Sequence, residues 1–388
     1  MFSIPSFSEL ADFFSDCSIE DVDRACRARQ QGRSLEFRDL AALLSPAADL
    51  HLSTLSRQSA ELTEKRFGRI IQLYAPLYLS NYCANRCQYC GFSADNRIER
   101  RILSLEEAEE EAMILEDRGF NHILLVSGEA PEKLGVDYLT ELARRISDRF
   151  AAISIEVQPL SREEYTRLFE AGITGVAVYQ ETYDREVYSR VHLGGRKTDY
   201  DYRLATLERA ASSGMREVGV GVLLGLADWR LEGLALGMHL SYLRKYFWQT
   251  ALTVSFPRIR PAAGDFQSLV PVGEQELAHL IFALRIFDPD VGLIVSTREE
   301  PRFRNGMIGL GPTRYSADSC TMPGGYSNPE LKGEQFAIGD QRSLPEICEA
   351  ILGKGYDPVR KDWDAVLQSP EGKTGPLEGE LRNEISDS

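Results

Sequence analysis

Three cysteines lie close together in the run Asn81–Ser93, as Cys83, Cys87 and Cys90. A [4Fe–4S] cluster has four irons, and full ligation takes four thiolates. Three thiolates separated by three and then two residues would leave one iron without a protein ligand. That iron could chelate a small molecule and pass an electron to it. The run therefore predicts a [4Fe–4S] cluster with one open coordination position.

The cysteines have two other interpretations. A structural zinc site needs a fourth Cys or His at a matching spacing, and the nearest histidines, His51 and His122, are remote from the triplet. Cysteines of a hydrophobic core do not usually gather beside Asn, Arg and Gln. The cluster is the favoured interpretation.

Composition limits the class of protein. The chain has 388 residues, 43% of them hydrophobic, which is enough to bury one large core. A formal net charge of −15 argues against a nucleic-acid partner, because phosphate binding needs a basic surface. The seven cysteines do not indicate a disulfide framework, and a labile cluster needs a reducing compartment. No signal-peptide pattern and no apolar run of about 18 residues is evident, so we expect a cytoplasmic protein without a membrane partner.

Strand-like and helix-like patterns alternate along the chain. The strand-like runs are Ile70–Leu79, His122–Val126, Ile153–Val157, Gly175–Tyr179, Glu217–Leu224, Leu252–Phe256, Gly292–Ser296 and Met307–Gly311. The helix-like segments are Ser104–Arg118, Val136–Phe150, Arg162–Ala171, Tyr202–Ser213, Leu231–Phe247 and Glu274–Phe287. Alternation of this kind indicates parallel strands joined by crossover helices. Eight repeats predict an α/β fold, a (β/α)8 TIM-type barrel, although a six-stranded three-quarter barrel would give a similar pattern.

Four regions are expected along the chain. Residues 1–68 have helical patterns and form an N-terminal extension, and residues 69–315 form the barrel core. Residues 316–367 form an irregular C-terminal segment that packs on the barrel and ends near Lys361–Asp364. Residues 368–388 are expected to be a disordered tail. Two helix starts carry the Ser-x-x-Glu spacing of a capping box, at Ser104 and Ser161.

Catalytic groups of such a barrel lie at the carboxyl ends of its strands. Polar groups recur at those positions, beginning with the cysteine run after the first strand. Glu156 and Glu181 are equally consistent with ion pairs and with acceptors for ribose hydroxyls. Arg298 is more specific, because a buried guanidinium must be paired and its fork suits a carboxylate. Arg258 and Arg260 are expected to form structural salt bridges.

The Cys83–Cys90 motif resembles that of the radical S-adenosylmethionine (SAM) superfamily. In that superfamily the open iron binds the amino and carboxylate groups of SAM, and one-electron reduction splits SAM into methionine and a 5′-deoxyadenosyl radical. Within it, the chain resembles the family of tyrosine lyases of thiamine biosynthesis. The tracts that carry the resemblance are Leu43–Ala47, Leu77–Ser93, Leu124–Glu129, Glu156–Leu160, Val178–Tyr183, Val254–Arg260, Val295–Glu299 and Pro323–Tyr326.

The resemblance implies which residues bind the cofactors. The three cysteines would ligate the [4Fe–4S] cluster. The SAM-binding residues would be Tyr89 beside the adenine, the turn Ser127, Gly128 and Glu129 at the methionine amino group, Glu156 at the ribose, and the strand glycines Gly221 and Gly225 behind the adenine. Glu181 is the second candidate carboxylate for cofactor binding. Ser127 departs from the usual Gly-Gly-Glu of the superfamily. The two strand glycines are also explained by close packing alone.

The resemblance also implies the substrate site and the reaction. Arg298 would bind the carboxylate of L-tyrosine with help from Ser316 or Ser319, and Tyr78 would flank the amine. After removal of a hydrogen, the Cα–Cβ bond would break and leave 2-iminoacetate and a hydroxybenzyl fragment, which would gain an electron and a proton and be released as p-cresol. The implied partners are a thiazole synthase subunit and a flavodoxin- or ferredoxin-type electron donor. No general base is assigned from the sequence, and His122 and Glu299 are the candidates.

Three alternatives remain open. A maturase of iron hydrogenase shares the tyrosine cleavage but needs three further C-terminal cysteines, and only Cys320 and Cys348 lie beyond residue 300. A tryptophan lyase or a deazaflavin-forming enzyme would need only a changed pocket. A non-enzymatic iron–sulfur protein would need neither Arg298 nor the barrel-mouth carboxylates.

Overall fold

The structure is a computed structural model, and it describes residues 2–360. The strands are β1 (Ile70–Ser80), β2 (His122–Ser127), β3 (Ala152–Glu156), β4 (Gly175–Ala177), β5 (Glu217–Gly221), β6 (Ala251–Ser255), β7 (Gly292–Val295), β8 (Arg314–Ser316) and β9 (Asp357–Val359). The helices are α1 (Phe7–Ala11), α2 (Ile19–Gln30), α3 (Phe37–Leu44), η1 (Pro46–His51), α4 (Leu52–Phe67), α5 (Leu105–Asp117), α6 (Val136–Ile146), α7 (Arg162–Glu170), α8 (Arg185–Val191), η2 (Arg196–Thr198), α9 (Tyr200–Leu204), α10 (Thr206–Ser212), α11 (Trp229–Tyr246), α12 (Glu274–Phe287), α13 (Pro301–Met307) and α14 (Leu344–Leu352).

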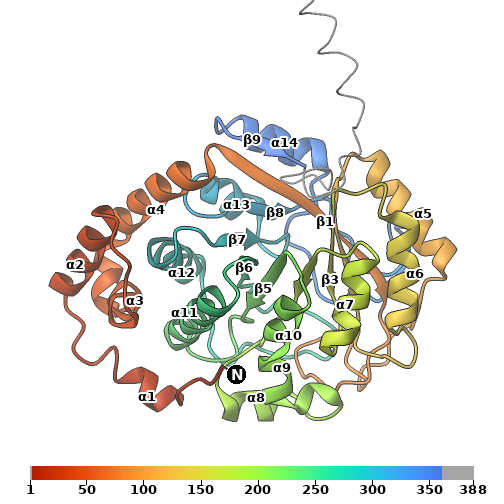
Figure 1. Ribbon diagram of the computed structural model, residues 1–388, viewed down its shortest axis with the longest axis horizontal. Helices are drawn as coiled ribbons and strands as arrows, with labels where there is room; N and C mark the ends of the chain where they lie inside the picture. The colour runs from red at the N-terminus through yellow and green to blue at the C-terminus, as the bar shows by residue number, and fades with distance from the viewer. Residues whose placement is uncertain (1, 361–388) are drawn as a thin grey trace, which may run out of the picture.

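Strands β1 to β8 form a closed parallel barrel (Figure 1). Each strand pairs with the next, and β1 closes the ring by pairing with both β2 and β8. The middle of β1 is buried throughout, as expected for a parallel strand covered by helices on its outer face. The (β/α)8 prediction is confirmed, and closure excludes the three-quarter barrel.

The eighth strand was predicted in the wrong place. Residues expected to form it, Met307–Gly311, instead end helix α13 and begin the following turn. Their apolar character arises because Met307 and Ile308 pack into the main core. Gly309 has a φ of 82°, a left-handed conformation that a regular strand does not contain. The actual strand, β8, follows at Arg314–Ser316.

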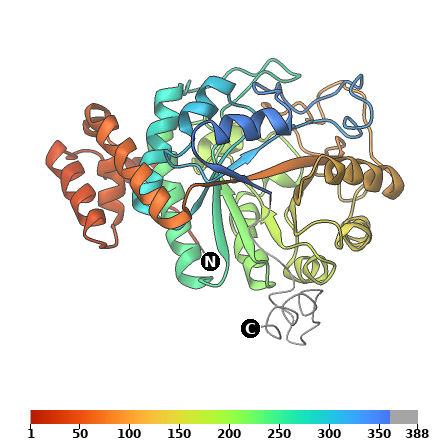
Figure 2. The same cartoon turned by 90° about the horizontal axis from the view of Figure 1, so that it is seen from above.

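Helices precede and cover the barrel. The segment before β1 is helical, as predicted, and lies to one side of the barrel (Figure 2). Both predicted capping boxes are present, at the starts of α5 and α7. The single helix expected over Tyr202–Ser213 is instead the pair α9 and α10.

A ninth strand was not anticipated. Gln72 of β1 is paired with Arg314 of β8 and also with Val359 of β9. Because a residue pairs with one neighbour on each side, β9 lies on the side of β1 opposite β8, with α14 packed near it (Figure 1). The predicted disordered tail, residues 368–388, and the Lys361–Asp364 patch lie outside the described residues. The boundaries proposed for the four regions stay predictions.

No helix within residues 2–360 combines the length and apolar character that a membrane crossing would need.

Candidate active site

The turn after β2 packs directly against the cysteine loop after β1. The Gly128 N–H donates to the Ser80 carbonyl at 2.9 Å, and the Ala84 N–H donates to the Glu129 carbonyl at 2.9 Å. A Cβ at Gly128 would lie 2.3 Å from the Tyr82 carbonyl oxygen, so a larger residue cannot occupy this position without moving the loop. The glycine of the predicted Ser127–Glu129 turn thus holds the two loops together.

The three cysteines line one cavity of about 70 Å³ at the barrel mouth. All three are free thiols, with Cys87 buried and the other two partly buried. Burial raises the pKa of Cys83 and of Cys90 above the ordinary value of a thiol. At Cys90 the Lys197 ammonium offsets part of this increase. Within residues 2–360 no three Cys, His, Asp or Glu side chains converge on a point suited to a single metal ion. Three cysteines around one cavity fit a cluster, in which each thiolate binds a different iron.

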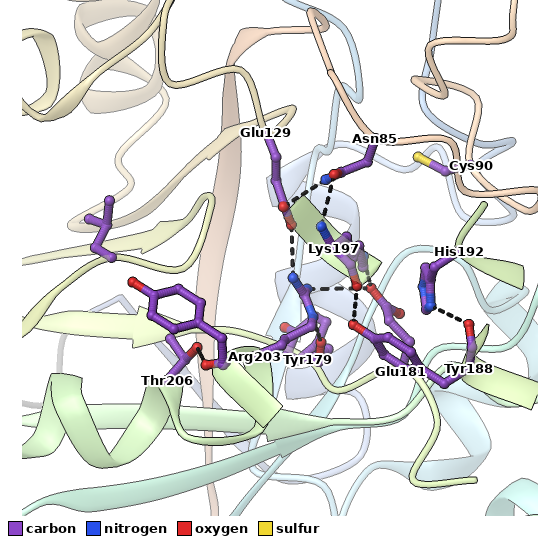
Figure 3. Close-up of polar contacts among 12 residues, drawn as sticks. Asn85, Cys90, Glu129, Tyr179, Glu181, Tyr188, His192, Lys197, Arg203 and Thr206 are labelled. Carbon is purple, nitrogen blue, oxygen red and sulfur yellow. Dashed lines mark hydrogen bonds and ion pairs between the residues drawn. The ribbon is translucent and has the colours of Figure 1, made fainter. Parts of the chain in front are cut away.

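A network of ion pairs borders the cysteine cavity (Figure 3). The buried Arg203 guanidinium binds Glu129 at 2.8 Å, and the Asn85 amide donates to the same carboxylate at 2.7 Å. The Lys197 ammonium lies 2.6 Å from Glu181. Burial alone would raise the pKa of Glu181, but Lys197 and Arg203 hold it below its ordinary value. Glu181 is therefore an ion-paired carboxylate, and its contact with a ribose stays a prediction.

Glu156 differs from Glu181 although both face the same cavity. Burial, reinforced by the charge of Glu181, raises the pKa of Glu156 to about 7. No ion pair joins Glu156 to another described residue. Glu156 also lines a second cavity, so this carboxylate stands at the boundary between two compartments.

The second cavity, of about 60 Å³, contains the residues predicted to bind the substrate: Tyr78, Arg298, Ser316 and Ser319. The Arg298 guanidinium lies over the Phe336 ring, 3.4 Å from its centroid. Burial lowers the pKa of Arg298, and this guanidinium forms no ion pair with any residue in the range 2–360. An unneutralised cation in a cavity is suited to an anionic ligand.

The neighbours of Arg298 offer further polar groups. The Ser319 hydroxyl is buried and has no hydrogen-bond partner in the described chain, so it can bond to a ligand. The Ser316 hydroxyl accepts from the Thr297 N–H at 2.9 Å and is already engaged. The Tyr78 hydroxyl donates to Gln335 at 2.7 Å, and burial raises the pKa of Tyr78 well above its ordinary value. The structure thus brings all four predicted substrate residues together.

The remaining predicted cofactor residues have structural partners of their own. The His192 Nδ1–H donates to a backbone carbonyl, so Nε2 accepts from the Tyr89 hydroxyl at 2.8 Å. A Cβ at Gly221 would lie 2.5 Å from the Tyr179 ring, and Gly225 has a φ of 114°. Close packing and backbone conformation therefore explain both glycines, and their contact with adenine stays a prediction.

Neither candidate general base occupies a suitable position. His122 is at the amino end of β2, where its Nε2 lies 3.0 Å from the Ser154 hydroxyl, far along the strand from the mouth. Glu299 is buried and ion-paired with Arg258 and, at 2.9 Å, with Arg260. The predicted structural role of these two arginines is confirmed, and the base hypothesis for His122 and Glu299 finds no support.

Four residues at the site are not among those that the sequence predicted. Lys197 and Arg203 come from the short elements η2 and α9, in a segment without a motif. Gln335 and Phe336 come from the irregular segment after β8, yet Gln335 lines both cavities. For Lys197 and Arg203 the one available signal was that buried carboxylates at the strand ends need basic partners.

Comparisons with known proteins agree with this geometry. The Radical SAM superfamily matches residues 77–235, and the Biotin and Thiamin Synthesis associated domain matches residues 255–357. The chain is 42% identical over 348 residues to a 2-iminoacetate synthase of Escherichia coli, covering 89% of this chain and 91% of that protein. It is 34% identical to the crystal structure of the FeFe-hydrogenase maturase HydG from Carboxydothermus hydrogenoformans, with a TM-score of 0.84, covering 92% and 84% of the two chains. A crystal structure of methylornithine synthase, at 22% identity and a TM-score of 0.70, shares the fold.

Proposed function

We propose that this chain, which belongs to the 2-iminoacetate synthase family of the radical SAM superfamily, cleaves L-tyrosine between Cα and Cβ. The products would be 2-iminoacetate, for thiazole formation in thiamine biosynthesis, and p-cresol. One observation carries the proposal: the cysteine cavity adjoins a second cavity that holds an unneutralised arginine, Arg298. An amino acid bound there by its carboxylate would lie beside the cofactor compartment.

The donor groups of the cofactor compartment match those that a [4Fe–4S] cluster with SAM would need. Cys83, Cys87 and Cys90 would hold the cluster, and the turn Ser127–Glu129 would face the amino group of SAM. Glu156, which has no ion pair with another described residue, is the better of the two ribose candidates. When bound, the cluster and SAM supply one-electron reduction and a 5′-deoxyadenosyl radical.

The residues of the second cavity would bind and orient tyrosine. The Arg298 guanidinium would bind the carboxylate through two parallel N–H···O bonds, and the Ser319 hydroxyl would supply a third donor. Tyr78, fixed by Gln335, would limit where the amine can lie. Holding the amine close to the cofactor compartment makes hydrogen removal an intramolecular event and keeps water out.

Two protein partners are part of the proposal. 2-Iminoacetate hydrolyses readily, so transfer to a thiazole synthase subunit is expected. Reduction of the cluster requires an electron donor of flavodoxin or ferredoxin type.

Product analysis tests the proposal. Reconstituted, reduced protein is incubated anaerobically with SAM and tyrosine, and in parallel with SAM and tryptophan. We expect p-cresol and 5′-deoxyadenosine from tyrosine. SAM cleavage without p-cresol would refute tyrosine lysis, and turnover of tryptophan alone would assign a related aromatic lyase. A cluster without any SAM cleavage would leave the non-enzymatic alternative.

The hydrogenase-maturase alternative has less support. Cys320 lies in the segment after β8, whereas Cys348 lies on helix α14, and neither is near a third cysteine in sequence. Detection of cyanide or carbon monoxide among the products would favour the maturase activity over the release of 2-iminoacetate.

A further inference from the structure

The segment between β8 and α14 lies at the barrel mouth, where its residue Gln335 lines both cavities. We name residues 317–340 of this segment the mouth strap. One buried guanidinium, that of Arg304 on α13, binds both ends: the Ser316 carbonyl before the strap and the Asp340 carboxylate at its end. The N–H groups of Gly339 and Asp340 also donate to the Thr297 carbonyl, at 2.9 and 3.0 Å. The strap is therefore fixed over the mouth at its two ends.

Within the strap, Gln335 contacts both halves of the site. Its side-chain oxygen accepts from the Tyr78 hydroxyl at 2.7 Å. Its side-chain nitrogen lies 3.8 Å from the Cys90 sulfur, within the longer range of an N–H···S bond. Its backbone carbonyl accepts from the Gly91 N–H at 3.1 Å. A Cβ at Gly91 would lie 2.5 Å from that same carbonyl oxygen, so Gly91 permits this close approach.

Chemistry determines which way the Gln335 amide faces. Bound to the cluster, Cys90 would be a thiolate, which accepts hydrogen bonds and cannot donate them, so the amide nitrogen must face it. The amide oxygen then faces Tyr78, whose neutral hydroxyl donates. The amide nitrogen of Gln335 thus faces the cysteine cavity, and its amide oxygen faces the substrate cavity.

We propose that Gln335 is a positioning residue, which donates to the Cys90 thiolate and at the same time holds the Tyr78 hydroxyl beside the substrate. This inference rests on the proposed function for its substrate half. A hydrogen bond to a cluster sulfur stabilises the reduced, more negative state and so raises the reduction potential. Loss of the bond should make the cluster harder to reduce, and loss of the acceptor should free the Tyr78 hydroxyl.

Two variants separate these effects. Gln335→Glu keeps an acceptor for Tyr78 but replaces the donor that faces Cys90 with a carboxylate oxygen. Gln335→Met removes both groups while keeping the length of the side chain. The matched control is Gln341→Glu, the same substitution at an exposed position just past the strap.

The readouts are the reduction potential of the cluster, followed by electron paramagnetic resonance, and the KM and kcat for tyrosine. At a fixed ambient potential we expect the ratio of reduced to oxidised cluster to fall about threefold in Gln335→Met and more in Gln335→Glu. We expect KM to rise several-fold in Gln335→Met, less in Gln335→Glu, and neither quantity to change in the control.

Several results would overturn the inference. Unchanged potentials in both Gln335 variants would remove the donor role, and an unchanged KM in Gln335→Met would remove the Tyr78 role. Loss of iron and sulfide would assign Gln335 to cluster assembly instead. A wild-type protein that holds the cluster but releases no p-cresol would refute the proposed function, while the comparison of potentials would still decide the contact with Cys90.

Discussion

Replacement of Arg298 separates substrate binding from stability more sharply than any other change at this site. The guanidinium forms no ion pair with a described residue, so Arg298→Ala leaves no protein carboxylate unpaired. Its contact with the Phe336 ring, at 3.4 Å, is the main stabilising interaction that is lost. Cation–π contacts contribute about 0.5 to 2 kcal/mol. The folded state should therefore lose no more than about 2 kcal/mol.

Tyrosine binding should lose much more. Hydrogen bonds to a charged group contribute about 1.5 to 3 kcal/mol each, and the proposed contact has two of them. Their combined loss of about 3 to 6 kcal/mol corresponds to a decrease in kcat/KM of about 100- to 20,000-fold. Arg298→Lys keeps the charge but loses the planar fork, so we expect an intermediate decrease.

The assay is the initial rate of p-cresol release at varied tyrosine, with iron and sulfide content and thermal unfolding measured on the same samples. Arg258→Ala is the matched comparison, because Arg258 is ion-paired with the buried Glu299 and its loss should lower stability first. A cluster content that falls in parallel with turnover in Arg298→Ala would refute the assignment of this arginine to the substrate. So would an unchanged kcat/KM.

Three further predictions concern the frame around the site. Burial raises the pKa of the Glu156 carboxyl from 4.5 to about 7, so this group is protonated in the folded state over a range where it is ionised in the unfolded state. The folded wild-type protein therefore loses stability as the pH rises from about 4.5 to about 7. Because Gln does not titrate, Glu156→Gln should gain stability relative to wild type between about pH 5 and pH 8, as measured by thermal unfolding of the apoprotein. Gly128→Ala should lower the iron content and the melting temperature, because its Cβ would lie 2.3 Å from a backbone oxygen, whereas Gly306→Ala, with no atom within 4 Å of the new Cβ, should do neither. Arg304→Met should lower stability in denaturant unfolding and speed proteolysis within residues 317–340, because the buried Asp340 would keep only its ion pair with Arg342, at 2.6 Å. Unchanged proteolysis would contradict the role of Arg304 in holding the strap.

The barrel could be predicted because local sequence patterns determine its elements. Ser104 and Ser161 mark the starts of α5 and α7 through side-chain bonds to residues three positions later, which short-range spacing reveals. The eighth strand could not be placed, because apolar residues at a helix end and in a strand look alike over five positions. Glycine conformation distinguishes the two, and conformation is visible only in the structure.

The candidate site was predictable where chemistry depends on spacing along the chain. The cysteines and Arg298 follow strands directly, so the fold alone brings them to the mouth. Lys197, Arg203 and Gln335 reach the site from distant segments, through contacts that no local pattern encodes. Gln335 lies 245 residues beyond Cys90, the cysteine it faces.

The position of β1 has a consequence for how the protein is made. This strand emerges first from the ribosome, yet the partner of Gln72 on β8, Arg314, follows 242 residues later. At ordinary elongation rates of about 5 to 20 residues per second, the edge of β1 that pairs with β8 stays unpaired for about 10 to 50 seconds. During translation that unpaired edge is a ready target for association with other nascent chains, so protection by a chaperone would improve the yield of intact protein.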